Sequence, residues 1–202
     1  MISHPLTLEG DVVRLEPLEE RHIPPLMAIA KATPELFKYT STPVTDEQAE
    51  DYFGRAFEER EQGRAYPFTL VYKTSGAVVG TSRFADIVWR HRNAELGFTW
   101  LTPRVQGSSV NVESKFLMLR HAFEALDFLR VHIITDTRNS QSQRAIRALG
   151  ATYEGTMRAH HVAKGDYVRD TMVFSVIRSE WPKVRAHLQR RMDAKREQVN
   201  AG

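Results

Sequence analysis

The segment from residue 94 to residue 135 constrains the fold more than any other part of the chain. Residues 94–101 alternate between apolar and polar side chains, which predicts a strand. A polar loop leads to apolar positions spaced as on a helix over residues 110–126, and residues 131–135 form a short β-branched strand. A strand, a helix and a strand in this order make a crossover between parallel strands. The apolar face of the first strand is predicted to carry Leu96, Phe98 and Trp100.

Hairpins and further helices account for the rest of the chain. β-rich runs predict strands at residues 12–15, 65–73, 77–88, 152–160 and 167–177. Apolar periodicity predicts helices at residues 19–31, 45–62, 140–149 and beyond residue 179. Since hairpins pair antiparallel, we expect an α/β (α+β) fold. Its mixed central sheet would be mostly antiparallel, with one parallel strand pair and helices on both faces.

Local signals fix several of these boundaries. Capping-box patterns at residues 45–48 and 140–143 predict that helices begin there. Residues 164–166, with a central glycine, predict the turn of the last hairpin.

Composition excludes several classes of chemistry. The 202 residues contain no cysteine, which excludes disulfides, thiolate nucleophiles and Cys-ligated zinc. The eight histidines show no metal-ligand spacing, and His160 and His161 are expected on opposite faces of a strand, so no metal is predicted. Neither a membrane span nor a signal peptide is recognisable, which favours a cytoplasmic protein without membrane partners.

Charge is distributed unevenly along the chain. Residues 1–100 hold 11 Lys+Arg and 15 Asp+Glu, a net charge of −4, whereas residues 101–202 hold 17 and 10, a net of +7. The excess in the second half favours an anionic ligand, such as a phosphorylated cofactor or nucleic acid. Residues 183–196 alone carry six Lys+Arg, so a solvated basic helix explains part of the excess equally well.

The loop at residues 104–109 is the first candidate binding site. It joins a predicted strand to a helix, whose first N–H groups are unpaired and carry the positive end of the helix dipole. Gly107 and the serines beside it are small enough to let a phosphate approach these amides. An ordinary tight turn fits the same residues. The loop lacks the Gly-Lys-Ser/Thr of a nucleoside triphosphate site and the spacing of a dinucleotide site.

Three motifs in this order resemble the GNAT N-acetyltransferases. The first is Glu95-Leu96-Gly97-Phe98-Thr99-Trp100-Leu101 followed by Arg104-x-x-Gly107-x-Ser109. The second is Asp136-Thr137-Arg138-Asn139-x-x-Ser142-x-x-Ala145-Ile146-x-x-Leu149-Gly150, and the third is Arg169-Asp170-Thr171-Met172-Val173-Phe174-Ser175-Val176 with Glu180-Trp181. Together they resemble the branch of RimJ and RimL, which includes acetyltransferases of ribosomal-protein N-termini. The resemblance covers roughly residues 6–181 and departs from the family at Ser109, where glycine or alanine is usual.

The resemblance implies that acetyl-CoA is the co-substrate, with no metal. Its pantetheine arm would enter between the parallel strands, which would splay apart to admit it, and its pyrophosphate would contact the loop amides. The cofactor-binding residues implied are Trp100, Leu101, Thr102, Arg104, Gln106, Gly107, Ser108, Ser109, Val110, Asn111, Asn139 and Ser142. Asn139 is also a good helix N-cap, so a purely structural role remains an alternative for it.

Acetyl transfer needs a neutral amine, which identifies a candidate base. An α-amine with a pKa of ~7.8 is far more often neutral at pH 7 than a lysine with a pKa of ~10.4. Glu95 matches the acidic strand residue of the family and is the candidate general base, although an ordinary salt bridge is the alternative. Ser142 matches the position implicated in protonating the leaving thiolate.

The acceptor is expected to be a primary amine on a protein N-terminus or on a small molecule. Phe37, Tyr39 and Arg83 are the candidate substrate-binding residues, although core packing explains Phe37 and Tyr39 equally well, and Arg83 would also suit a longer acyl group such as succinyl. A CoA- or RNA-binding module without catalysis is the alternative from another class, and nucleic acid is disfavoured because no aromatic RNA-binding motif is present. Residues 1–181 are expected to form the acyltransferase domain and residues 182–202 a basic helix or tail, and the family is compatible with a homodimer.

Overall fold

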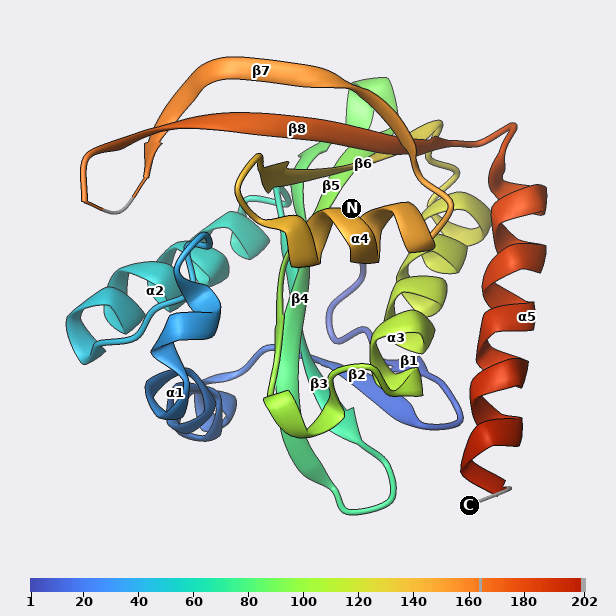
Figure 1. Ribbon diagram of the computed structural model, residues 1–202, viewed down its shortest axis with the longest axis horizontal. Helices are drawn as coiled ribbons and strands as arrows, with labels where there is room; N and C mark the ends of the chain where they lie inside the picture. Colours follow the sequence, from blue (N-terminus) through green and yellow to red (C-terminus); the bar gives the residue numbers. More distant parts are fainter. Residues whose placement is uncertain (164, 201–202) are drawn as a thin grey trace.

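Eight strands of the described residues form one sheet in the order β1-β2-β3-β4-β5-β6-β8-β7 (Figure 1). The structure, a computed structural model, describes residues 1–163 and 165–200, without the side chains of residues 198–200. The strands are β1 Leu8–Glu9, β2 Val13–Pro17, β3 Tyr66–Tyr72, β4 Ala77–Val88, β5 Asn93–Leu101, β6 Arg130–Asp136, β7 Thr152–Ala163 and β8 Tyr167–Ile177. β5 and β6 pair in parallel and every other neighbouring pair is antiparallel, which confirms the predicted mixed sheet.

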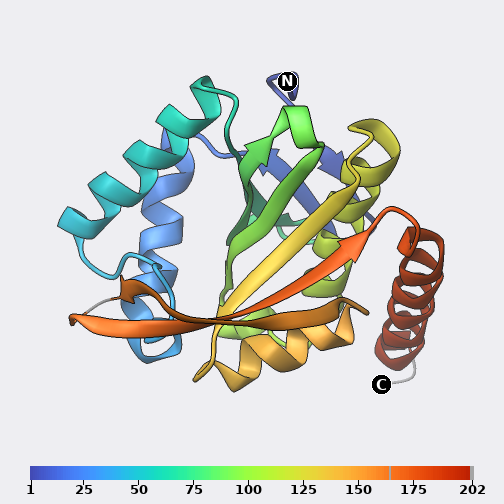
Figure 2. The ribbon, with the colours of Figure 1, turned by 90° about the horizontal axis from the view of Figure 1, so that it is seen from above.

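Helices cover both faces of this sheet, as predicted. They are α1 Ile23–Ala32, α2 Asp46–Glu61, α3 Ser109–Arg120, α4 Ser140–Ala148 and α5 Trp181–Asn200. α1 and α2 lie on one side of the central strands, and α3 and α5 lie on the other (Figures 1 and 2). None of the described helices is both long and apolar enough to cross a membrane.

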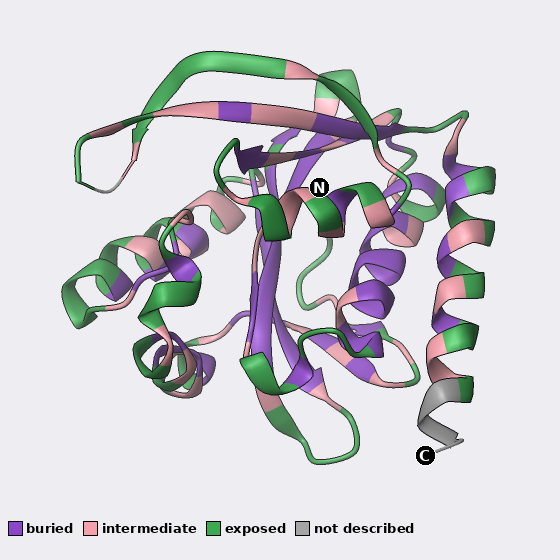
Figure 3. Ribbon diagram, in the orientation of Figure 1, coloured by how far each residue is buried: buried purple, intermediate pink, exposed green. Residues whose placement is uncertain are grey.

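Buried side chains form two apolar clusters, one on each face (Figure 3). The larger cluster joins the sheet to α3 and α5 and includes Phe116 and Leu188. The smaller cluster lies under α1 and α2 and includes Leu26, Phe53 and Trp100. The sheet is therefore covered by apolar helix faces on both sides, which is what a layered α/β domain requires.

Side-chain caps fix the first residues of the helices near the site. Thr45 Oγ1 accepts the Gln48 N–H at 3.3 Å, which confirms the predicted start of α2. The cap of α4 lies one residue before the predicted capping box, because Asn139 Oδ1 accepts the Ser142 N–H at 3.0 Å. The predicted box at residues 140–143 is therefore wrong in register by one residue.

A β-bulge in β5 overturns the predicted alternation of that strand. Thr81 pairs with Trp100 and Arg83 pairs with Gly97, so two residues of β5 face a single residue of β4 between these pairs. Phe98, within the bulge, has φ +52°. The extra residue moves Trp100 to the face covered by α1 and α2, whereas Leu96 stays in the α3 cluster.

Two other predictions differ from the structure in their details. The helix expected over residues 110–126 is α3 followed by a π-helical turn at His121–Ala125, in which the Leu126 N–H donates to His121 O at 3.0 Å. His160 and His161 do not point apart, because a register shift in β7 brings their Nδ1 atoms within 3.2 Å. In the turn predicted at residues 164–166, Lys164 lies outside the described residues.

Candidate active site

The parallel strands β5 and β6 separate after three residue pairs, which run from Asn93 with Arg130 to Glu95 with His132. Beyond this point β6 pairs only with β8, so the facing edge of β5 is left without a strand partner. A cavity of about 700 Å³ opens in this wedge, between the sheet and the first turns of α3 and α4. The predicted splayed pair is thus present, and its backbone edge is available to a ligand.

Most of the candidate site residues line this cavity. Those that do are Phe37, Tyr39, Glu95, Trp100, Leu101, Gln106, Gly107, Ser108, Asn111, Asn139 and Ser142. The candidates outside its described lining are Arg83, Thr102, Arg104, Ser109 and Val110. Ser109 is buried in the first turn of α3, so the departure from the family at this position does not narrow the cavity.

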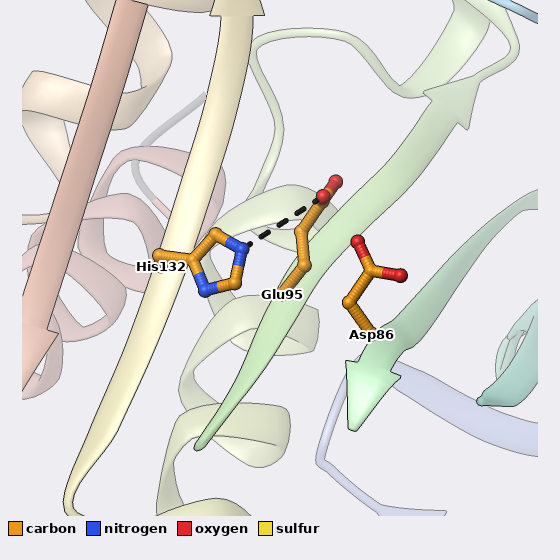
Figure 4. A group of neighbouring side chains, drawn as sticks. All are labelled: Asp86, Glu95 and His132. Carbon is orange, nitrogen blue, oxygen red and sulfur yellow. Dashed lines mark ion pairs between the residues drawn. The ribbon is translucent and has the colours of Figure 1, made fainter. Parts of the chain in front are cut away.

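Glu95 is buried at the point where the two strands part. Its Oε2 atom lies 4.0 Å from His132 Nε2, and Asp86 of β4 lies on its other side (Figure 4). Burial, with the charge of Asp86 as a smaller cause, raises the pKa of Glu95 from 4.5 to about 7. A carboxyl group with this pKa exchanges a proton near neutral pH, which is the property of a general base.

The ligand atoms of Asp86, Glu95 and His132 lie within 4.8 Å of one another. The spacing of the histidines in the sequence did not anticipate this group, because β6 brings His132 beside β5 only in the folded sheet. Burial lowers the pKa of His132, which favours the neutral form of this imidazole beside Glu95.

Gly97 is required for the position of the Glu95 side chain. A Cβ atom at Gly97 would lie 2.1 Å from Glu95 Oε1, well inside van der Waals contact. The carboxylate therefore lies against the β5 backbone in space that any other residue at position 97 would fill.

Lys115 is a buried cation that the sequence analysis did not identify. It lies on α3, lines the cavity, and donates to the hydroxyls of Ser82 at 2.9 Å and of Thr99. Burial lowers its pKa from 10.5 to about 7, although the nearby charge of Glu95 opposes this shift. The signal that the sequence offered was its spacing, three residues after Val112 and four before Leu119, which puts Lys115 on the apolar face of the helix.

The loop before α3 offers fewer free amides than its sequence indicated. The N–H groups of Gln106 and Ser108 donate within the turn, to Pro103 O at 3.1 Å and Val105 O at 3.2 Å. Ser108 Oγ caps α3 by accepting the Val110 N–H at 3.2 Å. Among the described residues, the Val105 N–H also donates within this turn, to Thr102 O at 3.1 Å. Gly107 has φ +77°, the left-handed region that favours glycine.

The far end of the cavity combines aromatic side chains with charge. Arg138 Nε and Nη2 donate to the Asp136 carboxylate at 3.0 and 2.9 Å, and the guanidinium lies 3.2 Å from the Tyr167 ring centroid and 4.8 Å from that of Tyr39. Burial alone would raise the pKa of Asp136, but the hydrogen bonds from Arg138 lower it below its usual value. His161 and Arg169 of the β7–β8 hairpin also line this end.

Arg83 is buried behind Tyr52 and Phe98, two aromatic residues of the cavity lining, and does not line the cavity itself. Its Nη1 atom lies 3.3 Å from Glu59 Oε2, and its guanidinium stacks 4.3 Å from the Phe98 ring centroid.

Comparisons with known proteins agree with this geometry. The family model described as "Acetyltransferase (GNAT) domain" matches residues 13–152. The chain is 28% identical over 150 residues to the uncharacterized N-acetyltransferase p20 of Bacillus licheniformis, which covers 73% of this chain and 83% of that protein. The crystal structure of a GCN5-related N-acetyltransferase from Brucella melitensis is 28% identical, with a TM-score of 0.84 over 94% of this chain and 86% of that one.

The likeness of fold extends to the ribosomal-protein branch. Mycobacterium smegmatis RimJ, solved in complex with CoA-disulfide, superposes with a TM-score of 0.78 at 21% identity, over 92% of this chain and 93% of that one. Since the family model spans well over half of the sequence, and the splayed strands and helix-capping loop lie within the matched segment, the chain belongs to the GNAT acetyltransferase family.

Proposed function

We propose that the protein transfers the acetyl group of acetyl-CoA directly to a primary amine, with Glu95 as the general base. The observation that carries this proposal is a buried carboxyl group with a pKa of about 7 at the apex of the cavity between β5 and β6. Membership of the GNAT family supports acetyl-CoA as the donor, as does the CoA-disulfide bound to the RimJ structure of similar fold.

The thioester of acetyl-CoA supplies the reactive acetyl group, and the chain supplies the orientation and the proton transfers. The unpaired edge of β5 beyond Glu95 offers backbone groups to the pantetheine arm and an N–H to the developing oxyanion. Glu95 accepts a proton from the acceptor ammonium, directly or through a water, so that the amine nitrogen forms a bond to the acetyl carbon. The bond from this carbon to sulfur then breaks, and the second proton of the nitrogen passes to the thiolate through the hydroxyl of Ser142, which lines the cavity.

The electrostatics of the acceptor end favour a cationic amine. Asp86 and Glu95 line the cavity beside each other and offer carboxylate oxygens to a protonated amine, while Arg138 already pairs with Asp136. Aromatic rings at the same end, from Phe37 and Tyr39, would pack against its carbon skeleton. An α-amine on a peptide or a small molecule is the acceptor class that we propose, since its pKa requires only a moderate base.

The position of Arg83 gives no support to a preference for succinyl-CoA. A succinyl group would need a cation near its carboxylate, and Arg83 was the residue expected to provide it. This guanidinium is instead held by Glu59 behind the ring of Phe98 and is not part of the cavity lining. We propose acetyl as the transferred group because the family model that matches the chain is that of acetyltransferases.

The role of Glu95 is tested by a pH–rate profile of acetyl transfer to an α-amine peptide. In the wild type, kcat/KM is expected to rise with pH through about 7, as Glu95 loses its proton. Glu95→Gln should lose that rise and roughly 100-fold in rate. The proposed base is wrong if the variant keeps the wild-type rate at every pH.

Gly97→Ala tests the same role without changing the carboxyl group. The new methyl would displace Glu95 Oε1, so we expect a lower kcat with little change in melting temperature, because a flexible side chain can move aside. Gly54→Ala in α2 is the matched control, since a Cβ there meets nothing within 4 Å. The control should keep full activity and gain about 0.5–1 kcal/mol of stability.

A further inference from the structure

We propose that α5 is part of the cofactor site, and that Arg191 and Lys195 bind the phosphate groups of CoA. This inference rests on the proposed function, since it takes the cavity to be the CoA site. It assigns a binding role to a helix that the sequence indicated only as a basic tail. The observations that carry it are the positions of these two cations in the cavity wall.

The two cations belong to a basic row along one edge of α5. His187, Arg191 and Lys195 are spaced four residues apart, so they project from the same side of the helix. His187 Nε2 lies 3.0 Å from Ala148 O, and Arg191 Nη1 donates to the same oxygen. Lys195 Nζ donates to Gly107 O, in the loop that precedes α3. The row thus spans from the C-terminal end of α4 to the phosphate-binding loop.

The rest of α5 is fixed in place, so the row is not a freely moving tail. Leu188 and Met192 are buried in the same cluster as α3. Near its C-terminal end, Arg196 pairs with Asp11 and lies 3.7 Å from the buried carboxylate of Glu113. That carboxylate also accepts the Val13 N–H at 2.8 Å. Arg191 and Lys195 lie between these anchors and are held at the cavity mouth.

The loop alone has too few donors for the charge of the ligand. The amides of Val105, Gln106 and Ser108 and the Ser108 hydroxyl already donate inside the turn, which leaves few loop N–H groups for a ligand among the described residues. CoA carries a diphosphate and a phosphate monoester, and a monoester alone carries roughly −1.5 to −2 charge at pH 7. Cationic side chains are therefore needed, and Arg104, the cation predicted for this role, lies outside the described cavity lining.

The alternative for Arg191 is that it only caps the C-terminus of α4. The donation to Ala148 O uses one of the five N–H donors of the guanidinium, and the others remain for an anion. Lys195 likewise keeps two of its three donors after bonding Gly107 O. The carboxylates in the described cavity lining belong to β4, β5 and β6, so none of them comes from the loop or from α5.

The test compares CoA with dephospho-CoA by titration calorimetry on the full-length protein. Arg191→Gln with Lys195→Gln should weaken CoA binding about tenfold or more, because charge-assisted phosphate contacts are lost. The matched control is Lys183→Gln with Arg190→Gln, which removes the same charge from exposed positions of α5 and should leave Kd unchanged. Lys195→Gln alone serves if the double variant melts early, since its bond is made to an exposed loop.

Each outcome distinguishes the two proposals. A loss confined to CoA assigns the row to the 3′-phosphate, and a loss for both ligands assigns it to the diphosphate, so both results support the inference. If the wild type binds CoA and the variants bind CoA and dephospho-CoA with the same Kd values as the wild type, α5 has no part in the site. If the wild type binds neither ligand, the proposed acetyl-CoA function itself fails.

Discussion

At the residue scale, the site is governed by two buried ionisable groups of opposite kind. Glu95 is harder to ionise than a free carboxyl group, and Lys115 is harder to protonate than a free lysine. Both shifts have burial as their main cause, and both place the pKa at about 7. The sequence showed the position of Glu95 but not its burial, and it did not reveal Lys115, because both depend on contacts between β5 and α3.

Lys115→Met is expected to raise the melting temperature near neutral pH. The unfolded chain binds a proton at Lys115 that the folded chain holds weakly, so wild-type stability rises with pH between about 7 and 10.5. The advantage of the methionine variant should therefore be larger at about pH 6 than at about pH 9, which thermal melts at both values measure. If the difference in melting temperature between the variant and the wild type is the same at both pH values, the lowered pKa of Lys115 is wrong.

The same substitution has a second consequence for catalysis. The positive charge of Lys115 lowers the pKa of Glu95, so its removal should move the midpoint of the pH–rate profile upward from about 7. Lys183→Met on the exposed side of α5 is the control, and it should change neither the melting temperatures at the two pH values nor the pH–rate profile.

At the scale of elements, the order and type of the strands and helices were predictable from periodicity and caps. The boundaries that failed did so at local irregularities that periodicity does not encode. One extra residue in the β5 bulge puts Trp100 on the opposite face of the sheet from the one predicted. The π-helical turn at His121–Ala125 ends the regular α-helix α3 at Arg120, before the predicted end at residue 126. β1 is only two residues long and was too short to show any alternation.

Asn139 offers a test of helix capping against ligand binding. Its Oδ1 caps α4, so Asn139→Ala should cost about 1 kcal/mol of stability. Asn139→Ser keeps a capping oxygen and should keep the melting temperature, but it loses the carboxamide nitrogen that would reach the cofactor. A raised KM for acetyl-CoA in the serine variant, at unchanged melting temperature, would establish binding. An unchanged KM would leave the cap as its whole role.

At the scale of the whole molecule, α5 is built into the core. The basic composition of residues 183–196 predicted a solvated helix, and its outward side fits that prediction. The inward side carries Val184, Leu188 and Met192 at a spacing that continues the α3 cluster. A count of basic residues does not reveal this apolar stripe, but the four-residue spacing of the apolar residues in the same segment does.

Leu188→Ala should therefore destabilise the entire protein. Its side chain is fully buried, so we expect a loss of about 2–5 kcal/mol in the free energy of unfolding, within one cooperative urea transition. Ala186 is exposed on the same helix, and Ala186→Ser is the control, with an effect below about 0.5 kcal/mol. A Leu188 variant as stable as the wild type would mean that α5 is a detachable tail.

The three residue pairs between β5 and β6 are also the place where two parts of the sheet meet. They connect a half-sheet of five strands to one of three strands, and beyond them the two halves diverge around the cavity. Glu95 and His132 form the last of these pairs, so the gap between the two strands begins there and runs to Leu101 and Asp136 at their ends. The proposed base therefore lies where the two parts of the sheet are still joined, and the substrates would lie where they are apart.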